Sequence, residues 1–112
     1  MIRILALVLL SFMGCEKDST TPCVEAPFEA YEWLSDMRDD LKKSDTPASI
    51  IQYTYKNECV YLVNGCGGCP DAMSMVYNSD GKEICKFGGI VGFNTCPDFS
   101  EQATNEKVLY EQ

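Results

Sequence analysis

The chain has 112 residues, enough for one small domain, and its 17 acidic against 9 basic side chains give a net charge of −8. An acidic chain repels nucleic acid, so we expect no nucleic-acid partner. Histidine is absent, which removes the commonest general base and the commonest metal ligand. We therefore expect a protein that is not an enzyme, with no catalytic residue, no metal and no cofactor.

Residues 1–14 have the layout of an export signal. Arg3 precedes a short apolar run, and Gly14 lies just before Cys15, after which the sequence turns polar. The run is too short to cross a bilayer, which takes about 20 apolar residues. The pattern resembles the lipobox of bacterial lipoproteins, in which the chain is cut before the cysteine and the cysteine is acylated. The resemblance implies a signal peptide at residues 1–14 and a membrane anchor of palmitate-like acyl chains on Cys15. An ordinary cleaved signal is the alternative.

Residues 15–26 are expected to be the lipidated cysteine and a flexible tether, because they show no periodicity and offer little to bury. The stretch Glu16, Lys17 and Asp18 resembles the signal found after the lipidated cysteine in surface-displayed lipoproteins of Bacteroidetes-type bacteria. This implies attachment to the outer membrane, on its periplasmic or its cell-surface face. Residues 27–112 then form a single small α+β domain.

The domain is expected to begin with one helix over residues 27–43. Pro27 suits a first turn, and apolar residues recur three or four positions apart from Tyr31 to Leu41. The opposite side carries acidic residues. These include Asp36, Asp39 and Asp40, which we interpret as solubilising charges rather than paired catalytic acids. Pro47 disfavours helix just before it and ends the element.

After Pro47 the period changes to two, which indicates strands. Residues 51–55 and 60–63 form a predicted hairpin around Lys56 and Asn57, with Tyr53 opposite Val60 and Ile51 opposite Leu62. Residues 73–77 and 82–87 form a second hairpin around the turn at residues 78–81. The remainder is expected to be mostly irregular, with residues 108–110 as a last short strand or a docked tail. The predicted fold class is α+β: one N-terminal helix packed on a four-stranded antiparallel meander.

Six cysteines remain besides Cys15, and an even number in a small exported domain predicts a disulfide framework. The sequence does not choose among the pairings. The cysteines expected to form disulfides are Cys23, Cys59, Cys66, Cys69, Cys85 and Cys96.

Several short stretches together resemble a known family. They are residues 53–57, 60–61, 66–71, 76–81, 84–85, 88–89 and 96–99. These stretches are similar to a family of small exported lipoproteins from Bacteroidetes-type bacteria that carry a domain of unknown function. The resemblance covers roughly residues 23–99 and implies export and a disulfide fold, but no activity.

The sequence also offers two other roles for the cysteines. Cys66 and Cys69 form a CxxC pair, the arrangement of thiol-disulfide oxidoreductases, although Asp71 would raise rather than lower a nearby thiol pKa. The same pair with Cys85 and Cys96 is the zinc alternative, which an oxidising exterior disfavours. A calcium loop starting at Asn78 is the alternative to a hairpin turn there, and the turn is preferred because the twelfth position of the calcium loop would need a glutamate and holds Gly89.

The function we expect is a binding or interaction module with a protein or glycan partner at the cell surface. The predicted surface is built from residues 64–72 and 87–97, because loops on a rigid scaffold concentrate binding residues. Phe93 and Tyr61 are the candidate binding residues, as exposed aromatics suit such contacts. A thiol-disulfide oxidoreductase using Cys66 and Cys69, and a protease inhibitor presenting residues 88–94, are the alternatives.

Overall fold

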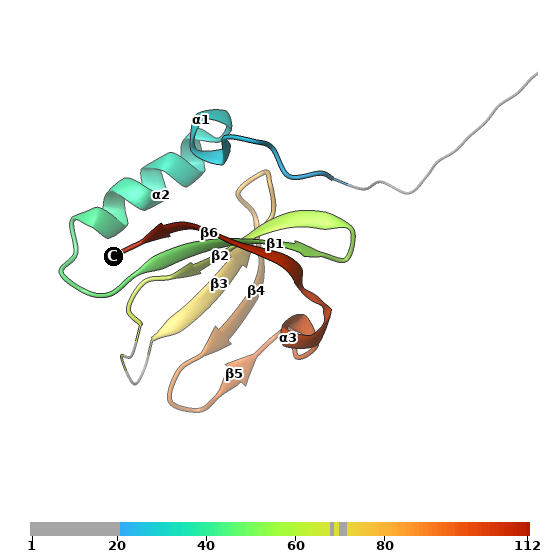
Figure 1. Cartoon of the computed structure of the whole chain (residues 1–112). Helices are drawn as coiled ribbons and strands as arrows, with labels where there is room; N and C mark the ends of the chain where they lie inside the picture. The colour runs from blue at the N-terminus through green and yellow to red at the C-terminus, as the bar shows by residue number, and fades with distance from the viewer. Residues whose placement is uncertain (1–20, 68, 70–71) are drawn as a thin grey trace, which may run out of the picture.

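The computed structural model describes residues 21–67, 69 and 72–112 (Figure 1). The predicted signal peptide, Cys15 and the first part of the predicted tether lie outside the described residues. The described residues form an α+β domain with a six-stranded antiparallel sheet and short helices. No helix in this part of the chain is both long enough and apolar enough to cross a membrane.

The sheet has the strand order β5-β4-β3-β2-β1-β6. Strands β1 to β4 form the predicted meander, but β5 and β6 extend it at its two edges, so the four-stranded prediction is wrong. The possible last strand at residues 108–110 is confirmed, but it is longer than expected. Strand β6 pairs with β1, which lies far away in the sequence, and local pattern does not show such a contact. The strands are β1 (Ser49–Tyr55), β2 (Glu58–Asn64), β3 (Met73–Tyr77), β4 (Glu83–Gly88), β5 (Phe93–Asn94) and β6 (Thr104–Glu111).

The first hairpin has the predicted register. Tyr53 is the partner of Val60, and Ile51 is the partner of Leu62. The two loop residues, Lys56 and Asn57, have φ angles of 52° and 66°. A two-residue loop with positive φ at both positions matches the right-handed twist of the strands that it joins.

The second hairpin joins β3 and β4 and is also confirmed. The side-chain oxygen of Asn78 accepts hydrogen bonds from the backbone N–H groups of Asp80 (2.9 Å) and Lys82 (3.0 Å). Gly81 has a φ of +83°, which only glycine adopts readily. The turn therefore forms from its own residues, as its sequence predicts.

The predicted single helix over residues 27–43 is interrupted. It consists of α1 (Pro27–Ala30) and α2 (Glu32–Lys42), because Tyr31 has extended backbone angles of −123° and 108°. The ring of Tyr31 packs 6.2 Å from Trp33 and 6.0 Å from Tyr61, measured between centroids. Aromatic packing on the sheet thus accompanies the break, which helical periodicity alone does not predict.

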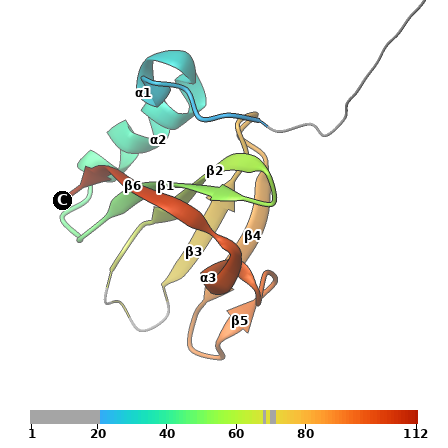
Figure 2. The same cartoon turned by 45° about the vertical axis from the view of Figure 1, so that its right-hand side comes forward.

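Both faces of the sheet are covered (Figures 1 and 2). Strand β2 lies in the middle of the sheet and buries successive residues on alternate faces, so five consecutive side chains are buried. On the α2 face the buried residues are Leu34, Ile50, Cys59, Tyr61 and Val63. On the other face they are Tyr55, Val60, Leu62, Val76, Cys85 and Phe99.

The second face is covered by α3 (Phe99–Gln102), which the sequence did not predict. The helix has only four residues, so it shows no periodicity. Its first residue, Phe99, is 6% exposed and packs against Tyr53, Tyr55 and Phe87. The residues after β4, expected to be mostly irregular, thus supply a short strand, a helix and the edge strand β6.

Candidate functional site

The described residues pair the six predicted cysteines in three disulfides: Cys23 with Cys59, Cys66 with Cys69, and Cys85 with Cys96. Cys59 and Cys85 are each 1% exposed and belong to opposite cores. Each of these two bridges therefore attaches a peripheral segment to the centre of the sheet, and the third closes a short surface turn.

The Cys23–Cys59 bridge fastens the chain before α1 to the start of β2. Thr21 also donates a backbone hydrogen bond of 2.9 Å to the carbonyl of Asn57 and accepts one of 3.0 Å from Cys59. The predicted flexible tether covered residues 15–26. Its described part, from Thr21 onward, is instead held against the β1–β2 hairpin.

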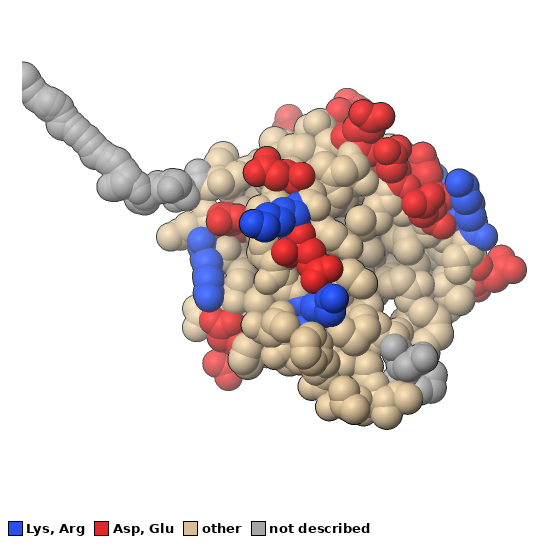
Figure 3. Space-filling view, turned by 180° about the vertical axis from the view of Figure 1, so that it is seen from behind, with Lys and Arg blue, Asp and Glu red and all other residues tan. Residues whose placement is uncertain are grey.

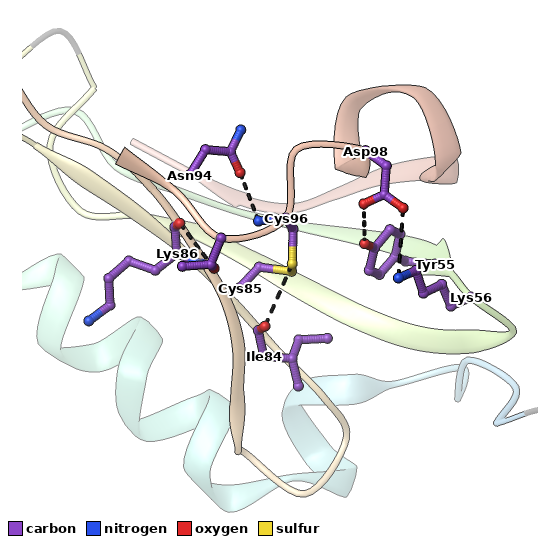
Figure 4. The surroundings of a disulfide bond; sticks show 9 residues. Tyr55, Lys56, Ile84, Cys85, Lys86, Asn94, Cys96 and Asp98 are labelled. Carbon is purple, nitrogen blue, oxygen red and sulfur yellow. Dashed lines mark hydrogen bonds and ion pairs between the residues drawn. A yellow bond between two sulfur atoms is a disulfide. The ribbon is translucent and has the colours of Figure 1, made fainter. Parts of the chain in front are cut away.

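The Cys85–Cys96 bridge closes the base of the loop between β4 and β5 (Figure 4). Beside it, the Lys86 N–H donates to the Thr95 hydroxyl at 2.9 Å, and the Thr95 N–H donates to the Lys86 carbonyl at 3.0 Å. The Asn94 side chain accepts a bond of 2.8 Å from the Cys96 N–H. The loop is therefore held at its base by a covalent bond and by hydrogen bonds on both strands.

The tip of this loop is a turn with apolar residues at its centre. The N–H of Gly92 donates to the carbonyl of Gly89 at 3.2 Å, which places Ile90 and Val91 at the two central positions. Ile90 is 80% exposed and Val91 is 88% exposed, and Phe93 beside them is 48% exposed. Turns favour Gly, Pro, Asn, Asp and Ser at their central positions. A pair of β-branched aliphatic residues there breaks that local preference. We call residues 89–93 the apolar tip.

The two loops of the predicted binding surface lie side by side. Gly89 donates a backbone hydrogen bond of 2.9 Å to the carbonyl of Ala72, which precedes β3. A Cβ added at Gly88 would lie 2.7 Å from the same oxygen, so the backbones approach too closely for a side chain. Residues 64–67, 69 and 72 thus lie at the same end of the sheet as the apolar tip (Figure 1).

The loop that carries the apolar tip is also free of charge in the sequence. Residues 87–97 contain no Asp, Glu, Lys or Arg, although 23% of the chain is charged. Figure 3 shows the face seen from behind: acidic groups form a band along its upper right, whereas the described residues at its lower end are mostly uncharged. An uncharged, apolar protrusion on an acidic domain is typical of a contact surface.

The two predicted binding aromatics lie in different environments. Phe93 is half exposed on β5 and is the last residue of the apolar tip. Tyr61 is 0% exposed and packs beneath α2, where burial, and then Tyr31, raise its pKa to about 12. Its assignment as an exposed binding residue is wrong, because the sheet has helices on both faces rather than on one.

Sequence reasoning missed Ile90, Val91 and Asp98. The signal for the first two was present: β-branched residues between glycines in a turn. Asp98 precedes α3 and accepts a hydrogen bond of 2.6 Å from the hydroxyl of Tyr55, with the Lys56 amine 3.7 Å from its other oxygen. The Tyr55 hydrogen bond holds the pKa of Asp98 below its usual value. This carboxylate is therefore ionised at neutral pH and serves as an anchor for the segment before α3, not as a proton donor.

The sulfur atoms of Cys66, Cys69, Cys85 and Cys96 are all used in disulfides, so they do not provide the thiolates that zinc requires. Over the described residues, no three Cys, Asp or Glu side chains gather closely enough to hold a metal ion.

The chain was compared with known proteins. No curated protein and no solved structure matches it. A family model described as a domain of unknown function (DUF6970) matches residues 37–112, from the middle of α2 to the last residue. The match includes β6, which lies beyond the residues 23–99 expected from the sequence resemblance. Because the matched residues make up more than half of its length, the chain belongs to the DUF6970 family.

Proposed function

We propose that this protein is a non-catalytic binding module, lipid-anchored through Cys15 to the outer membrane of a bacterium, which binds a partner protein through its apolar tip. The observation that carries the proposal is the exposure of Ile90 and Val91, 80% and 88%, at the centre of a turn whose base is closed by a disulfide. Such a protrusion gains free energy when a partner covers it, about 25 cal/mol per Å² of apolar surface buried.

Rigidity supports this role. Binding loses less free energy when the loop is already ordered, because fewer conformations are lost on association. The Cys85–Cys96 bridge and the hydrogen bonds between Lys86 and Thr95 hold the loop in one shape. Phe93, half exposed beside the turn, adds an aromatic ring of the kind enriched at the centre of interfaces.

The position of the proposed anchor indicates which way the apolar tip faces. Cys23 is bonded to Cys59 at the start of β2, whereas the tip lies beyond the opposite end of that strand, beside Ala72. A lipid on Cys15 is eight residues from Cys23, so the chain between them spans at most about 28 Å. Attachment at this end favours an orientation with the β1–β2 hairpin nearer the membrane and the apolar tip farther from it. This geometry favours a partner protein over insertion of the tip into the same bilayer.

Two alternatives are less well supported. An oxidoreductase would use the Cys66–Cys69 bridge, but this bridge lies in a surface turn, and the described residues beside it do not begin a helix that would lower a thiol pKa. An inhibitor would present residues 88–94 as an extended strand to a protease. The turn between Gly89 and Gly92 instead folds this segment back on itself.

Site-specific photo-crosslinking on intact cells tests the proposal. A photoreactive residue at position 91 should give a discrete crosslinked product with a partner protein. The same residue at position 108, where Val108 is 50% exposed on β6, is the matched control and should not. Phe93→Ala should weaken capture of that partner by about 1–2 kcal/mol, the usual scale for losing an interface aromatic, and leave the melting temperature nearly unchanged. Equal crosslinking from both positions, or none from position 91, would contradict the proposal.

A further inference from the structure

A groove of about 340 Å³ lies on the α3 face of the sheet, separate from the apolar tip. Its walls come from three elements that are distant in the sequence: Tyr53 of β1, Phe87 of β4 and Phe99 of α3. Leu62 of β2 lies at its apolar base, 8% exposed. The groove exists because α3 has only four residues and covers only part of this face. Its volume falls within the range of small-ligand sites, at the lower end.

Aromatic rings dominate the walls of the groove. The Phe99 ring lies 5.3 Å from that of Tyr53, edge to face, and 5.7 Å from that of Phe87, measured between centroids. Phe99 is buried, whereas Tyr53 and Phe87 are partly exposed where they line the groove. These contacts hold the three rings in fixed positions, so the walls of the groove are formed before a ligand arrives.

The charge of the groove has one sign. Glu106 of β6 is its only charged lining residue, and it forms no ion pair with any residue that the structure describes. Tyr53 and Glu106 line the same groove. Burial raises the pKa of Tyr53, and the negative charge of Glu106 raises it further. The lining therefore combines aromatic faces, two hydroxyl groups (Tyr53 and Ser100) and one carboxylate, with no basic side chain.

We propose that this groove binds the ammonium group of an organic cation. Aromatic rings attract cations through the negative charge of their faces, and a carboxylate adds a direct charge interaction. An anionic ligand would be repelled by Glu106, and a neutral apolar ligand would gain nothing from it. The ammonium group has two sources, a small quaternary amine or the side chain of a lysine on another protein. This site is independent of the apolar tip and of the role proposed for it.

A titration with matched ligands tests this inference on the full-length protein in a maltoside detergent, which carries no ammonium group. Choline is compared with 3,3-dimethyl-1-butanol, its neutral isostere, and Nα-acetyl-lysine methylamide represents the protein source. At least one of the two cations should bind saturably and shift the NMR signals of the Tyr53 and Phe87 rings. The neutral isostere should bind at least about tenfold more weakly, a difference of about 1.4 kcal/mol. The preferred cation then identifies the source.

Charge variants complete the test. Glu106→Gln should weaken binding of the cation about fivefold to tenfold, because it removes only the charge. The affinities for choline and for its neutral isostere should then differ less than in the wild type. Glu101→Gln, on the exposed side of α3 and outside the groove, is the control and should leave binding unchanged. The inference is overturned if no cation binds saturably, if the neutral isostere binds as well as choline, or if the two variants have equal effects.

Discussion

The hydroxyl of Tyr55, at the end of β1, donates a hydrogen bond of 2.6 Å to the carboxylate of Asp98, just before α3 (Figure 4). The two residues are 43 positions apart in the chain. The ring of Tyr55 also packs 4.9 Å from Phe99 between centroids, so one residue holds the start of α3 by both polar and apolar contact. This pairing positions the short helix that covers the second face of the sheet.

The Tyr55–Asp98 pair should make stability depend on pH. The hydrogen bond from Tyr55, and then the charge of Lys56, lower the folded-state pKa of Asp98. A lowered pKa means that the carboxylate contributes stability above its unfolded pKa of about 3.9, and that this contribution is lost as the pH falls through the folded value. Tyr55→Phe should therefore reduce the loss of unfolding free energy below about pH 4. Urea unfolding of the wild type and of Tyr55→Phe across a pH series measures this loss.

Two further observations control that experiment. Asp98→Asn should have a similar effect on the pH dependence, and adding Tyr55→Phe to it should cost less stability than Tyr55→Phe alone, because the shared interaction is already gone. If all variants keep the acid dependence of the wild type, the hydrogen bond does not shift this carboxylate.

The contribution of each disulfide to stability should increase with the length of the loop that it closes. The paired cysteines are 36 positions apart for Cys23–Cys59, 11 for Cys85–Cys96 and 3 for Cys66–Cys69. A longer loop restricts the unfolded chain more, which predicts about 4, 3 and 1.5 kcal/mol in turn. Three variants, each with both cysteines of one bridge changed to alanine, are unfolded in urea, and the loss of unfolding free energy is compared among them. A larger loss on removing Cys66–Cys69 than on removing Cys85–Cys96 would contradict it.

Gly81→Ala should destabilise the domain. The φ of Gly81 is +83°, and a Cβ there would lie 3.0 Å from ring carbons of Trp33. Trp33 donates its indole N–H to the Ser79 carbonyl in the same turn at 3.0 Å, so the ring cannot move without losing that bond. We expect a loss of about 1–3 kcal/mol from backbone strain and crowding.

The matched control for that variant is Gly65→Ala. An added Cβ there meets nothing within 4 Å, and the φ of Gly65 is outside the positive range. It should change the unfolding free energy by less than about 0.5 kcal/mol. Thermal unfolding of both proteins separates the two effects, and equal losses would mean that the contact with Trp33 is unimportant.

Tyr61→Ala should cost about 3–5 kcal/mol, since it removes a large, fully buried side chain from the core under α2. Phe93→Ala, at a half-exposed position, should cost less than about 1 kcal/mol. Chemical denaturation of the two variants measures the difference. If Tyr61→Ala lost no more unfolding free energy than Phe93→Ala, Tyr61 would not be a core residue.

The local features of this protein follow from short stretches of its sequence. The positions of Lys56 and Asn57, with alternating residues on both sides, decided the register that pairs Tyr53 with Val60. The turn at Gly81 formed as predicted, and the even number of cysteines predicted the disulfides. These features depend on residues near each other in the chain or on counting, so no distant contact is needed to infer them.

Other features depend on contacts between distant segments and become visible only in the folded domain. Tyr61 is buried because α2 packs on one face of β2, and Val60 because α3 and its neighbours cover the other. Strand β6 forms because β1 offers it an unpaired edge, although most of its side chains are exposed. The apolar tip and the groove beside Glu106 arise in the same way, from segments that approach only after the chain folds. Local propensity is weak where pairing and burial are set by partners far along the chain.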